Sequence, residues 1–356
     1  MSSRTGEIWL LWHGDAGAGV DAHVIWLADA LRVQGLAARI ICLGRPTPML
    51  RNLAAEQAVA VLSIEARPTA LLRAIAGARP RLLHTHGTCA GALGRTLGWI
   101  LGVPVVSTPR RGPRTRHRAG LCQLLDHLSL ALPHEQIVLR EPSDACPPTP
   151  KGARLVSRFL PLAERPAVLP RTIGYIVGPG RNDRPEPFFQ LAEMVPPMDL
   201  ALYFTMKQTV PPAGWHRAMN VRASLGREHV RRCPNIRCVD GLGAALPWRE
   251  IGLLCVTAAD DIGLERALQA MAHGIPVVAF GEEPLRYLIA DGDNGWLVKS
   301  GNLAEMARRI SKWQAMDEAS RRVLSDGARR TVAKHYSPQT AVPVVLDAYA
   351  SVGARR

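Results

Sequence analysis

The stretch from Asp260 to Val298 constrains the fold of this chain more than any other. Residues 263–273 carry apolar side chains at helical spacing, Gly274 is typical of a helix C-terminus, and Pro276 prevents the helix from continuing. Residues 276–280 then form a short apolar run of the kind that is buried in parallel sheets. A helix followed at once by a buried strand is typical of an α/β domain, and the N-terminus of such a helix favours anions.

The beginning of the chain carries the same kind of pattern. Residues 7–13 and 38–43 are predicted strands, and residues 21–34 between them have helical apolar spacing. The glycine-rich segment 14–19 joins the first strand to the helix, which makes a βαβ unit. Further strands are predicted at 81–87, 103–108, 172–178, 199–204, 235–241 and 251–257, and further helices at 90–101, 121–132, 186–194, 302–316, 318–335 and 341–350. We therefore expect an α/β fold with parallel sheets.

Length and composition suit two globular domains. The chain has 356 residues, of which 47% are hydrophobic and 21% are charged. The proline-rich segment 141–170 is predicted to contain the linker between the domains. The seven cysteines lack a zinc-site spacing, and the sequence begins without a basic leader and apolar core, so a cytoplasmic protein with reduced thiols is expected.

Residues 110–118 concentrate positive charge, with five arginines and one histidine, in a chain of net charge +14. This segment is interpreted as a solvated loop, as a phosphate contact, or as a contact with an anionic membrane surface, which would make the protein peripheral on the inner face of the plasma membrane. The overall charge bias also fits an arginine-rich composition, because only 5 of the 44 basic residues are lysine. Aromatic residues do not alternate with these arginines, so nucleic acid is not expected as a partner.

The segment His84-Thr85-His86-Gly87 ends a predicted strand. His84 and His86 lie on one face of that strand because side chains alternate with a period of two. No third metal ligand is evident, so a metal site is not expected. We interpret His84 as a satisfied core histidine and His86, at the carboxyl end of the strand, as the better candidate for a site.

Gly17-x-Gly19-x-x-Ala22 also matches a dinucleotide-binding fingerprint. Such a fingerprint for NAD requires an acidic residue after the second strand, where this chain has Arg45. Only an NADP-binding interpretation is therefore compatible with this segment.

Two motifs give the chain a family resemblance. Ala270-Met271-Ala272-His273-Gly274-Ile275-Pro276-Val277-Val278-Ala279 and the segment 291–298, expected as a hairpin, resemble the C-terminal half of the retaining GT-B glycosyltransferases of family 4 (group 1). That family has two glutamates separated by seven residues in the preceding helix. The corresponding positions here are Asp261 and Gln269, so the motif is degenerate.

The resemblance implies specific roles for residues of this chain. Asp261 would bond the hydroxyl groups of the donor sugar, Gln269 would hold the ribose, and Arg181 and Arg184 would neutralise the donor phosphates. The implied catalytic residues are His86, Arg110 and Asp261, with Arg110 at the position of a family histidine. The implied donor-binding residues are Gly17, Gly19, Arg181, Arg184, Gly241, Ile262, Gly263, Leu264 and Gln269.

The resemblance also implies a fold and an activity. It implies two Rossmann-like domains facing a central cleft, with residues 1–165 binding the acceptor, residues 166–335 binding the nucleotide-sugar, and 336–356 forming a closing helix that crosses back to the first domain. The implied activity is metal-independent retaining hexosyl transfer from a UDP or GDP sugar to a saccharide or lipid-linked acceptor, without a cofactor, in cell-surface polysaccharide or lipopolysaccharide synthesis. Two alternatives stay open: a non-catalytic GT-B partner or sugar-binding protein, and an NADP-linked oxidoreductase.

Overall fold

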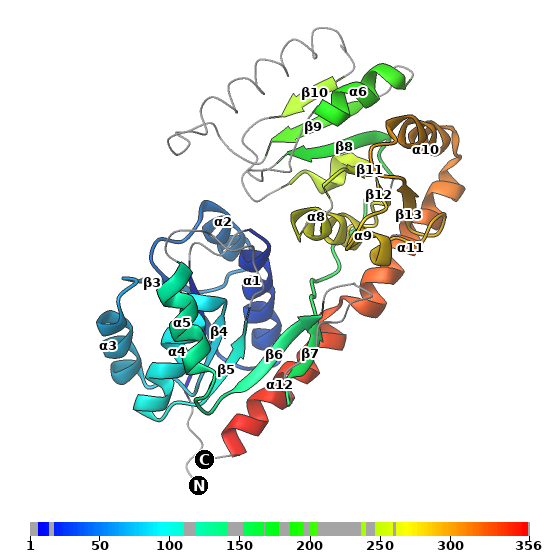
Figure 1. Ribbon diagram of the computed structural model, residues 1–356. Helices are drawn as coiled ribbons and strands as arrows, with labels where there is room; N and C mark the ends of the chain where they lie inside the picture. The colour runs from blue at the N-terminus through cyan, green and yellow to red at the C-terminus, as the bar shows by residue number, and fades with distance from the viewer. Residues whose placement is uncertain are drawn as a thin grey trace. The chain divides into compact units, whose positions relative to one another are not determined.

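The computed structural model describes residues 6–13, 18–109, 119–140, 152–166, 168–177, 186–195, 199–204, 236–239, 246–258 and 261–354. The chain divides into two compact units (Figure 1). Unit 1 contains Met1–Glu141, Ala145–Phe159 and Tyr336–Arg356, and unit 2 contains Pro142–Asp144 and Leu160–His335. The division thus falls between Phe159 and Leu160, before the boundary expected at residue 165, and the C-terminal segment belongs to unit 1.

Unit 1 is built on a parallel sheet with the strand order β3-β2-β1-β4-β5-β6-β7. Its strands are β1 (Ile8–His13), β2 (Ala38–Leu43), β3 (Val61–Ile64), β4 (Leu82–His86), β5 (Val105–Thr108), β6 (Glu135–Arg140) and β7 (Arg154–Ser157). Its helices are α1 (Ala18–Val33), α2 (Pro48–Glu56), α3 (Pro68–Ala78), α4 (Thr88–Leu101), α5 (Ala119–Ser129) and α12 (Pro338–Ala354). From β1 the chain adds β2 and β3 on one side, and from β4 it adds β5, β6 and β7 on the other side. The strand order therefore reverses between β1 and β4.

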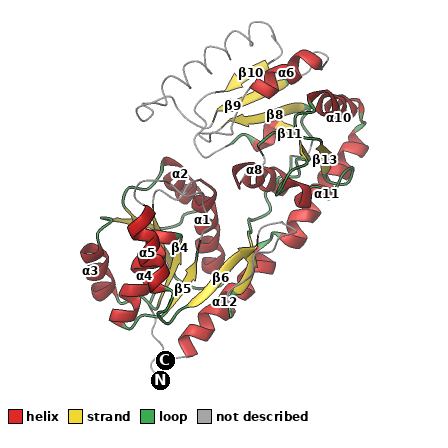
Figure 2. Ribbon diagram, in the orientation of Figure 1, coloured by secondary structure: helices red, strands yellow, loops and turns green. Residues whose placement is uncertain are grey.

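Alternate side chains of β1 enter two different cores. Leu10 and Trp12 pack with residues of α1 and α12, whereas Trp9 and Leu11 pack with residues of α3 and α4. Both faces of the sheet are therefore covered by helices (Figure 2), which explains why these strands read as continuous apolar runs in the sequence.

The C-terminal helix α12 completes unit 1. It packs against β5, β6, β7 and α1, and the side chain of Arg154 on β7 pairs with Asp347 on this helix. The hydroxyl of Tyr349 lies 2.8 Å from Nδ1 of His84, in the middle of the sheet. Residues separated by most of the chain length therefore share one core.

Unit 2 is built on a second parallel sheet, with the order β10-β9-β8-β11-β12-β13. Its strands are β8 (Thr172–Val177), β9 (Leu200–Phe204), β10 (Ile236–Val239), β11 (Ile251–Val256), β12 (Val277–Phe280) and β13 (Gly295–Val298). Its helices are α6 (Glu186–Met194), the 3-10 helix η1 (Trp248–Glu250), α8 (Asp261–Ala272), α9 (Leu285–Leu288), α10 (Leu303–Ala315) and α11 (Glu318–His335). Here the topology reverses between β8 and β11.

The expectation of a hairpin at residues 291–298 was wrong. β13 pairs in parallel with β12 instead. The close approach of the two strands requires a glycine, because a Cβ on Gly295 would lie 2.1 Å from the carbonyl oxygen of Val277. The buried Asn294 fixes the preceding turn, since its side chain accepts from the Ala290 amide at 2.9 Å and donates to the Leu288 carbonyl at 3.1 Å.

One further expectation about local structure is corrected, and one is extended. The segment 141–170, expected to contain the linker, includes the division between Phe159 and Leu160 and also contains β7, which pairs in parallel with β6 and adds an edge strand to unit 1. Helix α1 begins at Ala18, before the residue expected from the apolar spacing, so Gly19 belongs to the first turn of the helix and not to a loop. None of the helices in the described parts of the chain is long and apolar enough to span a membrane.

The hydrogen bond between Tyr349 and His84 is expected to stabilise unit 1. Replacing Tyr349 with Phe removes the buried hydroxyl and leaves a polar imidazole atom without its partner, so the free energy of unfolding should fall by about 1–3 kcal/mol. Tyr287→Phe is the matched control, because its hydroxyl bonds Glu283 at the surface and its loss should change stability by less than about 0.5 kcal/mol. Urea unfolding monitored by circular dichroism measures both; equal stability of the two variants would contradict this role of α12.

Candidate functional site

Each sheet has one position that favours ligand binding. In open parallel sheets, ligands bind outside the carboxyl ends of the strands where the strand order reverses. This point lies between β1 and β4 in unit 1 and between β8 and β11 in unit 2.

In unit 1, buried nitrogen atoms gather at the carboxyl ends of β1 and β4. Trp12 pairs with His86 across the two strands, and the ring of His23 on α1 lies 5.9 Å from that of His86. Trp12 Nε1, His23 Nδ1 and His86 Nε2 are buried and have no hydrogen-bond partner among the residues that the structure describes. Because a buried polar atom without a partner is costly, these atoms mark a place where a polar group from elsewhere would be stabilised.

The histidines of this cluster are uncharged near neutral pH. Burial, with a smaller contribution from the Arg158 charge, lowers the pKa of His23 to about 3. Burial and the neighbouring His23 lower the pKa of His84 to about 3. Burial also holds the pKa of His86 well below its ordinary value, and His84 and His23 add to the effect. Neutral imidazoles and an indole N–H suit hydroxyl groups better than anions.

His84 has a structural role in this cluster. Its Nδ1 contacts the Tyr349 hydroxyl and its Nε2 contacts Thr108 Oγ1, both at 2.8 Å. The interpretation of His84 as a satisfied core histidine is therefore confirmed. Its ring lies 4.3 Å from that of His86, so it also helps to hold the His86 ring in place.

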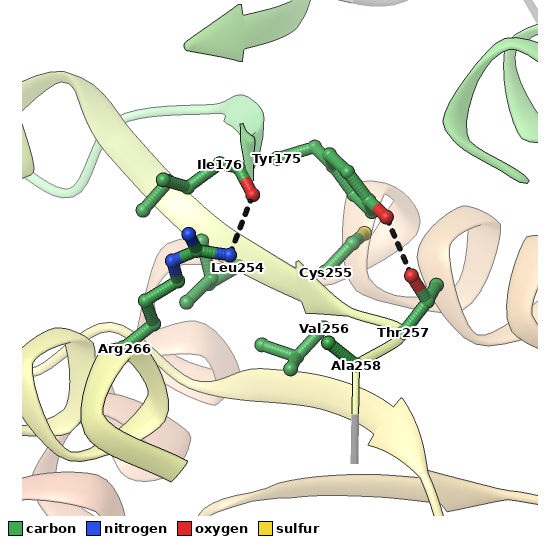
Figure 3. Close-up of a pocket in the computed structure, with 8 residues that line it drawn as sticks. All are labelled: Tyr175, Ile176, Leu254, Cys255, Val256, Thr257, Ala258 and Arg266. Atoms are coloured by element: carbon green, nitrogen blue, oxygen red, sulfur yellow. Dashed lines mark hydrogen bonds between the residues drawn. The ribbon is translucent and has the colours of Figure 1, made fainter. Parts of the chain in front are cut away.

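In unit 2, a hollow lies at the reversal between β8 and β11 (Figure 3). It is small, with a cavity volume of about 10 Å³, which is room for roughly one water molecule, and it opens to solvent. It is lined by Tyr175, Ile176, Leu254, Cys255, Val256, Thr257, Ala258 and Arg266. The hydroxyls of Tyr175 and Thr257 are in hydrogen-bond contact at one side of it.

Arg266 brings a positive charge to this hollow. It projects from α8, and its Nη1 donates to the carbonyl oxygen of Ile176 on β8 at 3.0 Å (Figure 3). Cys255 is a poor nucleophile here, because burial raises the pKa of its thiol. The sequence reasoning missed Arg266, although its place one turn into the helix of the strongest motif was a usable signal.

The start of α8 lies very close to the end of β11. A Cβ on Gly263 would lie 1.8 Å from the carbonyl oxygen of Ala258, so only glycine fits there. Leu264 is fully buried and Ile262 is half-buried. The positive end of the helix dipole is therefore held at the carboxyl edge of the sheet, beside the hollow that Ala258 lines.

Glu265 is a second residue that the sequence reasoning missed. It is buried, and its Oε1 accepts a hydrogen bond from Nε2 of Gln269, one turn later in α8, at 3.0 Å. A carboxylate can only accept hydrogen bonds, so it fixes which way the amide of Gln269 points. The spacing of four residues between an acid and an amide on one helix was the available signal.

The structure describes only some of the remaining predicted site residues. Asp261 is the first residue of α8, and His86 is the last residue of β4. Gly17, Arg110, Arg181, Arg184 and Gly241 lie outside the described residues. Among the described residues, no group of three or more histidine, cysteine, aspartate or glutamate side chains has the arrangement of a metal site.

Known proteins share both the fold and parts of the sequence. The family model described as "Glycosyl transferases group 1" matches residues 266–331, which include most of α8 and the strands β12 and β13. The phosphatidyl-myo-inositol mannosyltransferase of Mycobacterium leprae is 24% identical over 370 residues, which covers 95% of this chain and 94% of that protein.

Solved structures match nearly the whole chain. The Anabaena protein Alr3699/HepE in complex with UDP has a TM-score of 0.72 at 13% identity, with coverage of 97% of this chain and 100% of that chain. Sucrose-phosphate synthase from Thermosynechococcus elongatus has a TM-score of 0.73 at 16% identity, with coverage of 99% and 100%. The protein has the GT-B fold. The family match and the mannosyltransferase relative support glycosyltransferase activity.

The buried histidines predict a loss of stability in mild acid. Their pKa values in the folded protein lie below the ordinary value of 6.5, so the unfolded chain binds more protons below that pH. The free energy of unfolding should therefore fall as the pH drops below about 6.5, approaching roughly 1.4 kcal/mol per pH unit for each histidine.

A histidine variant identifies the source of this slope. His84→Gln removes one of the titrating groups and should reduce the slope between pH 6.5 and 5.5, where most carboxylates have not yet titrated. Urea unfolding at a series of pH values measures it, and His335→Gln, at the exposed end of α11, is the control. An unchanged slope in His84→Gln would mean that His84 already carries its proton in the folded protein.

Proposed function

We propose that this protein transfers a hexose from a UDP or GDP sugar to a saccharide or lipid-linked acceptor, with retention at the anomeric carbon and without a metal. The observation that carries the proposal is the start of α8 at the strand reversal of unit 2, with a cation beside a small hollow that opens to solvent. In a GT-B fold, that arrangement suits the diphosphate of a nucleotide-sugar. Structures of the Anabaena neighbour that hold UDP and UDP-glucose support the choice of donor.

Charge stabilisation is the proposed catalytic effect on the donor side. Departure of the nucleoside diphosphate develops negative charge on its phosphates, and cations and a helix N-terminus can stabilise that charge without a metal. We assign this role to Arg181 and Arg184, with Gly17, Gly19, Gly241 and the first-turn amides of Ile262, Gly263 and Leu264 near the donor. Arg266, bonded to the end of β8, adds to the positive potential there.

Gln269 is the proposed ribose contact, and Glu265 is its positioning residue. Because Nε2 of Gln269 donates to Glu265, the amide oxygen points the other way. That oxygen can then accept hydrogen bonds from ribose hydroxyls, as the glutamate of the family motif would. Gln269 thus supplies a hydrogen-bond acceptor at position 269, although the negative charge of the pair lies one turn earlier, on Glu265.

The acceptor is assigned to unit 1. The buried nitrogens of Trp12, His23 and His86 belong to uncharged side chains, and such groups suit the hydroxyls of a saccharide. His86 and Arg110 are the proposed residues at the reacting centre on this side, and Asp261 is proposed to bond the donor sugar. The relative that is a phosphatidyl-myo-inositol mannosyltransferase supports a lipid-linked acceptor, as cell-surface polysaccharide or lipopolysaccharide synthesis would require.

The pair Glu265 and Gln269 gives the test of the donor site. Gln269→Leu removes the ribose acceptor and should weaken UDP or GDP binding about fivefold, since a hydrogen bond of this kind contributes on the order of 1 kcal/mol. Gln269→Glu places two carboxylates side by side and should bind worse than the parent. The exchange Glu265→Gln with Gln269→Glu restores an amide-to-carboxylate bond and should recover binding.

Calorimetric titration with UDP, GDP and NADP measures these affinities, and turnover of nucleotide-sugars in EDTA measures activity. Gln314→Leu is the matched control. Gln314 lies on α10, and its side-chain amide donates a hydrogen bond to the Arg171 carbonyl oxygen at 3.0 Å. The loss of this hydrogen bond should leave nucleotide binding unchanged. If Gln269→Leu binds the nucleotide as the parent does, the ribose assignment is wrong. A parent that binds NADP and no nucleoside diphosphate would favour an oxidoreductase, and activity only with Mn²⁺ or Mg²⁺ would contradict the metal-free mechanism.

A further inference from the structure

A buried ion pair lies behind the strand end that carries His86. Arg95 on α4 is 1% exposed, and its guanidinium pairs with the carboxylate of Asp126 on the neighbouring helix α5 (Figure 1). The guanidinium also donates to Ser129 Oγ, at 3.1 Å from Nε and 2.9 Å from Nη2, and to the main-chain oxygen of Asp126 at 3.1 Å. A positive charge is thus held inside unit 1, away from solvent.

This network reaches the sheet through two hydroxyl groups. Nη1 of Arg95 donates to Ser107 Oγ at 3.2 Å, and Thr85 Oγ1 donates to the same atom at 2.9 Å. Thr85 directly precedes His86, the last residue of β4, and Ser107 is the next-to-last residue of β5. The ion pair is therefore connected to both strands one residue before their carboxyl ends.

The same strand ends are linked on the other face of the sheet. Nε2 of His84 contacts Thr108 Oγ1 at 2.8 Å, and side chains that alternate along a strand point to opposite faces. The main-chain amide of Gly87, directly after His86, donates to the Thr108 carbonyl oxygen at 3.0 Å. Hydrogen bonds to β5 thus hold the residues before and after His86.

Helix α4 is closely packed around the network. A Cβ on Gly94 would lie 2.3 Å from Cγ2 of Thr85, and a Cβ on Gly91 would lie 3.0 Å from the Asp126 carboxylate. Protein interiors leave no room for a larger side chain at such short distances. The two glycines therefore let α4 approach β4 and α5 closely enough for Arg95 to bridge them.

Stability does not account for a buried ion pair of this kind. The cost of taking both charges out of water offsets most of their attraction, and apolar residues of similar volume are often equally stable in their place. A fully bonded polar network does, however, fix the geometry of its members. We infer that Arg95 and Asp126 are positioning residues, which hold the carboxyl ends of β4 and β5 and thereby fix the ring of His86. Only the contact of His86 with an acceptor rests on the proposed function; the positioning itself does not.

The variant Arg95→Met with Asp126→Leu removes both charges at similar volume. Its urea midpoint of unfolding should equal or exceed that of the parent, because no charge has to be desolvated. The ring of His86 should nevertheless lose its fixed position. In nuclear magnetic resonance of the full chain with carbon-13 in the histidine rings, the His86 resonance, assigned from His86→Gln, should shift and broaden. The amide of Gly87 should exchange its hydrogen roughly tenfold faster.

Asp126→Asn should give the opposite pattern. The amide oxygen can still accept from the guanidinium, but the Arg95 charge loses its counter-charge inside the protein. The urea midpoint should therefore fall, whereas the His86 resonance and the exchange of Gly87 should stay as in the parent. Arg165→Met with Asp326→Leu is the matched control, because it removes an ion pair from unit 2 and should leave both readouts unchanged.

These readouts need neither donor nor acceptor, so they can fail independently of the proposed function. A double variant of Arg95 and Asp126 with the parent's His86 resonance and Gly87 exchange would overturn the positioning role. A double variant that does not fold, or that unfolds at a lower urea midpoint than Asp126→Asn, would assign the ion pair to stability instead. Equal disturbance of His86 in Asp126→Asn and in the double variant would mean that charge, and not bonded geometry, acts on this ring.

Discussion

The parallel pairing of the strands is the constraint on which the rest of this structure depends. Each connection between parallel strands must cross a face of the sheet, so helices cover both faces and the carboxyl ends of the strands gather at one edge. That edge collects Trp12 and His86 in unit 1, and Thr257 and Ala258 in unit 2. The candidate sites therefore follow from topology before any side chain is considered.

The two edges differ in chemistry, and the difference fits two kinds of ligand. In unit 1 the gathered groups are an indole and imidazoles that burial keeps uncharged. In unit 2 they are an arginine, a helix start and a carboxylate that orients an amide. Uncharged donors and acceptors suit hydroxyls, whereas positive charge suits phosphates, so one chain can hold an acceptor and a nucleotide-sugar in separate units.

Much of the fold could be predicted from the sequence, because buried parallel strands and helices leave strong local patterns. The helix and strand at 263–280 and the core role of His84 were predicted correctly. The parallel pairing of β13 was not, because it depends on contact between Gly295 and the distant Val277 backbone.

The candidate site was harder to predict than the fold. The resemblance located α8 and its glycine, yet Arg266 and Glu265 lie at positions that the motif leaves unspecified. Their roles depend on three-dimensional contacts, with the Ile176 carbonyl and with the Gln269 amide. The motif therefore predicted where the site lies, whereas the contacts seen in the structure identified Arg266 and Glu265 as further residues of it.

Hydrogen exchange of the full chain with and without UDP or GDP tests directly whether unit 2 binds the donor. If the reversal point of unit 2 binds the nucleotide, amides at the ends of β8 and β11 and in the first turns of α8 should exchange more slowly with the ligand, while those of β1 and β4 should be unchanged. Slower exchange at β1 and β4 alone, or protection by NADP and not by UDP or GDP, would contradict the assignment of the donor to unit 2.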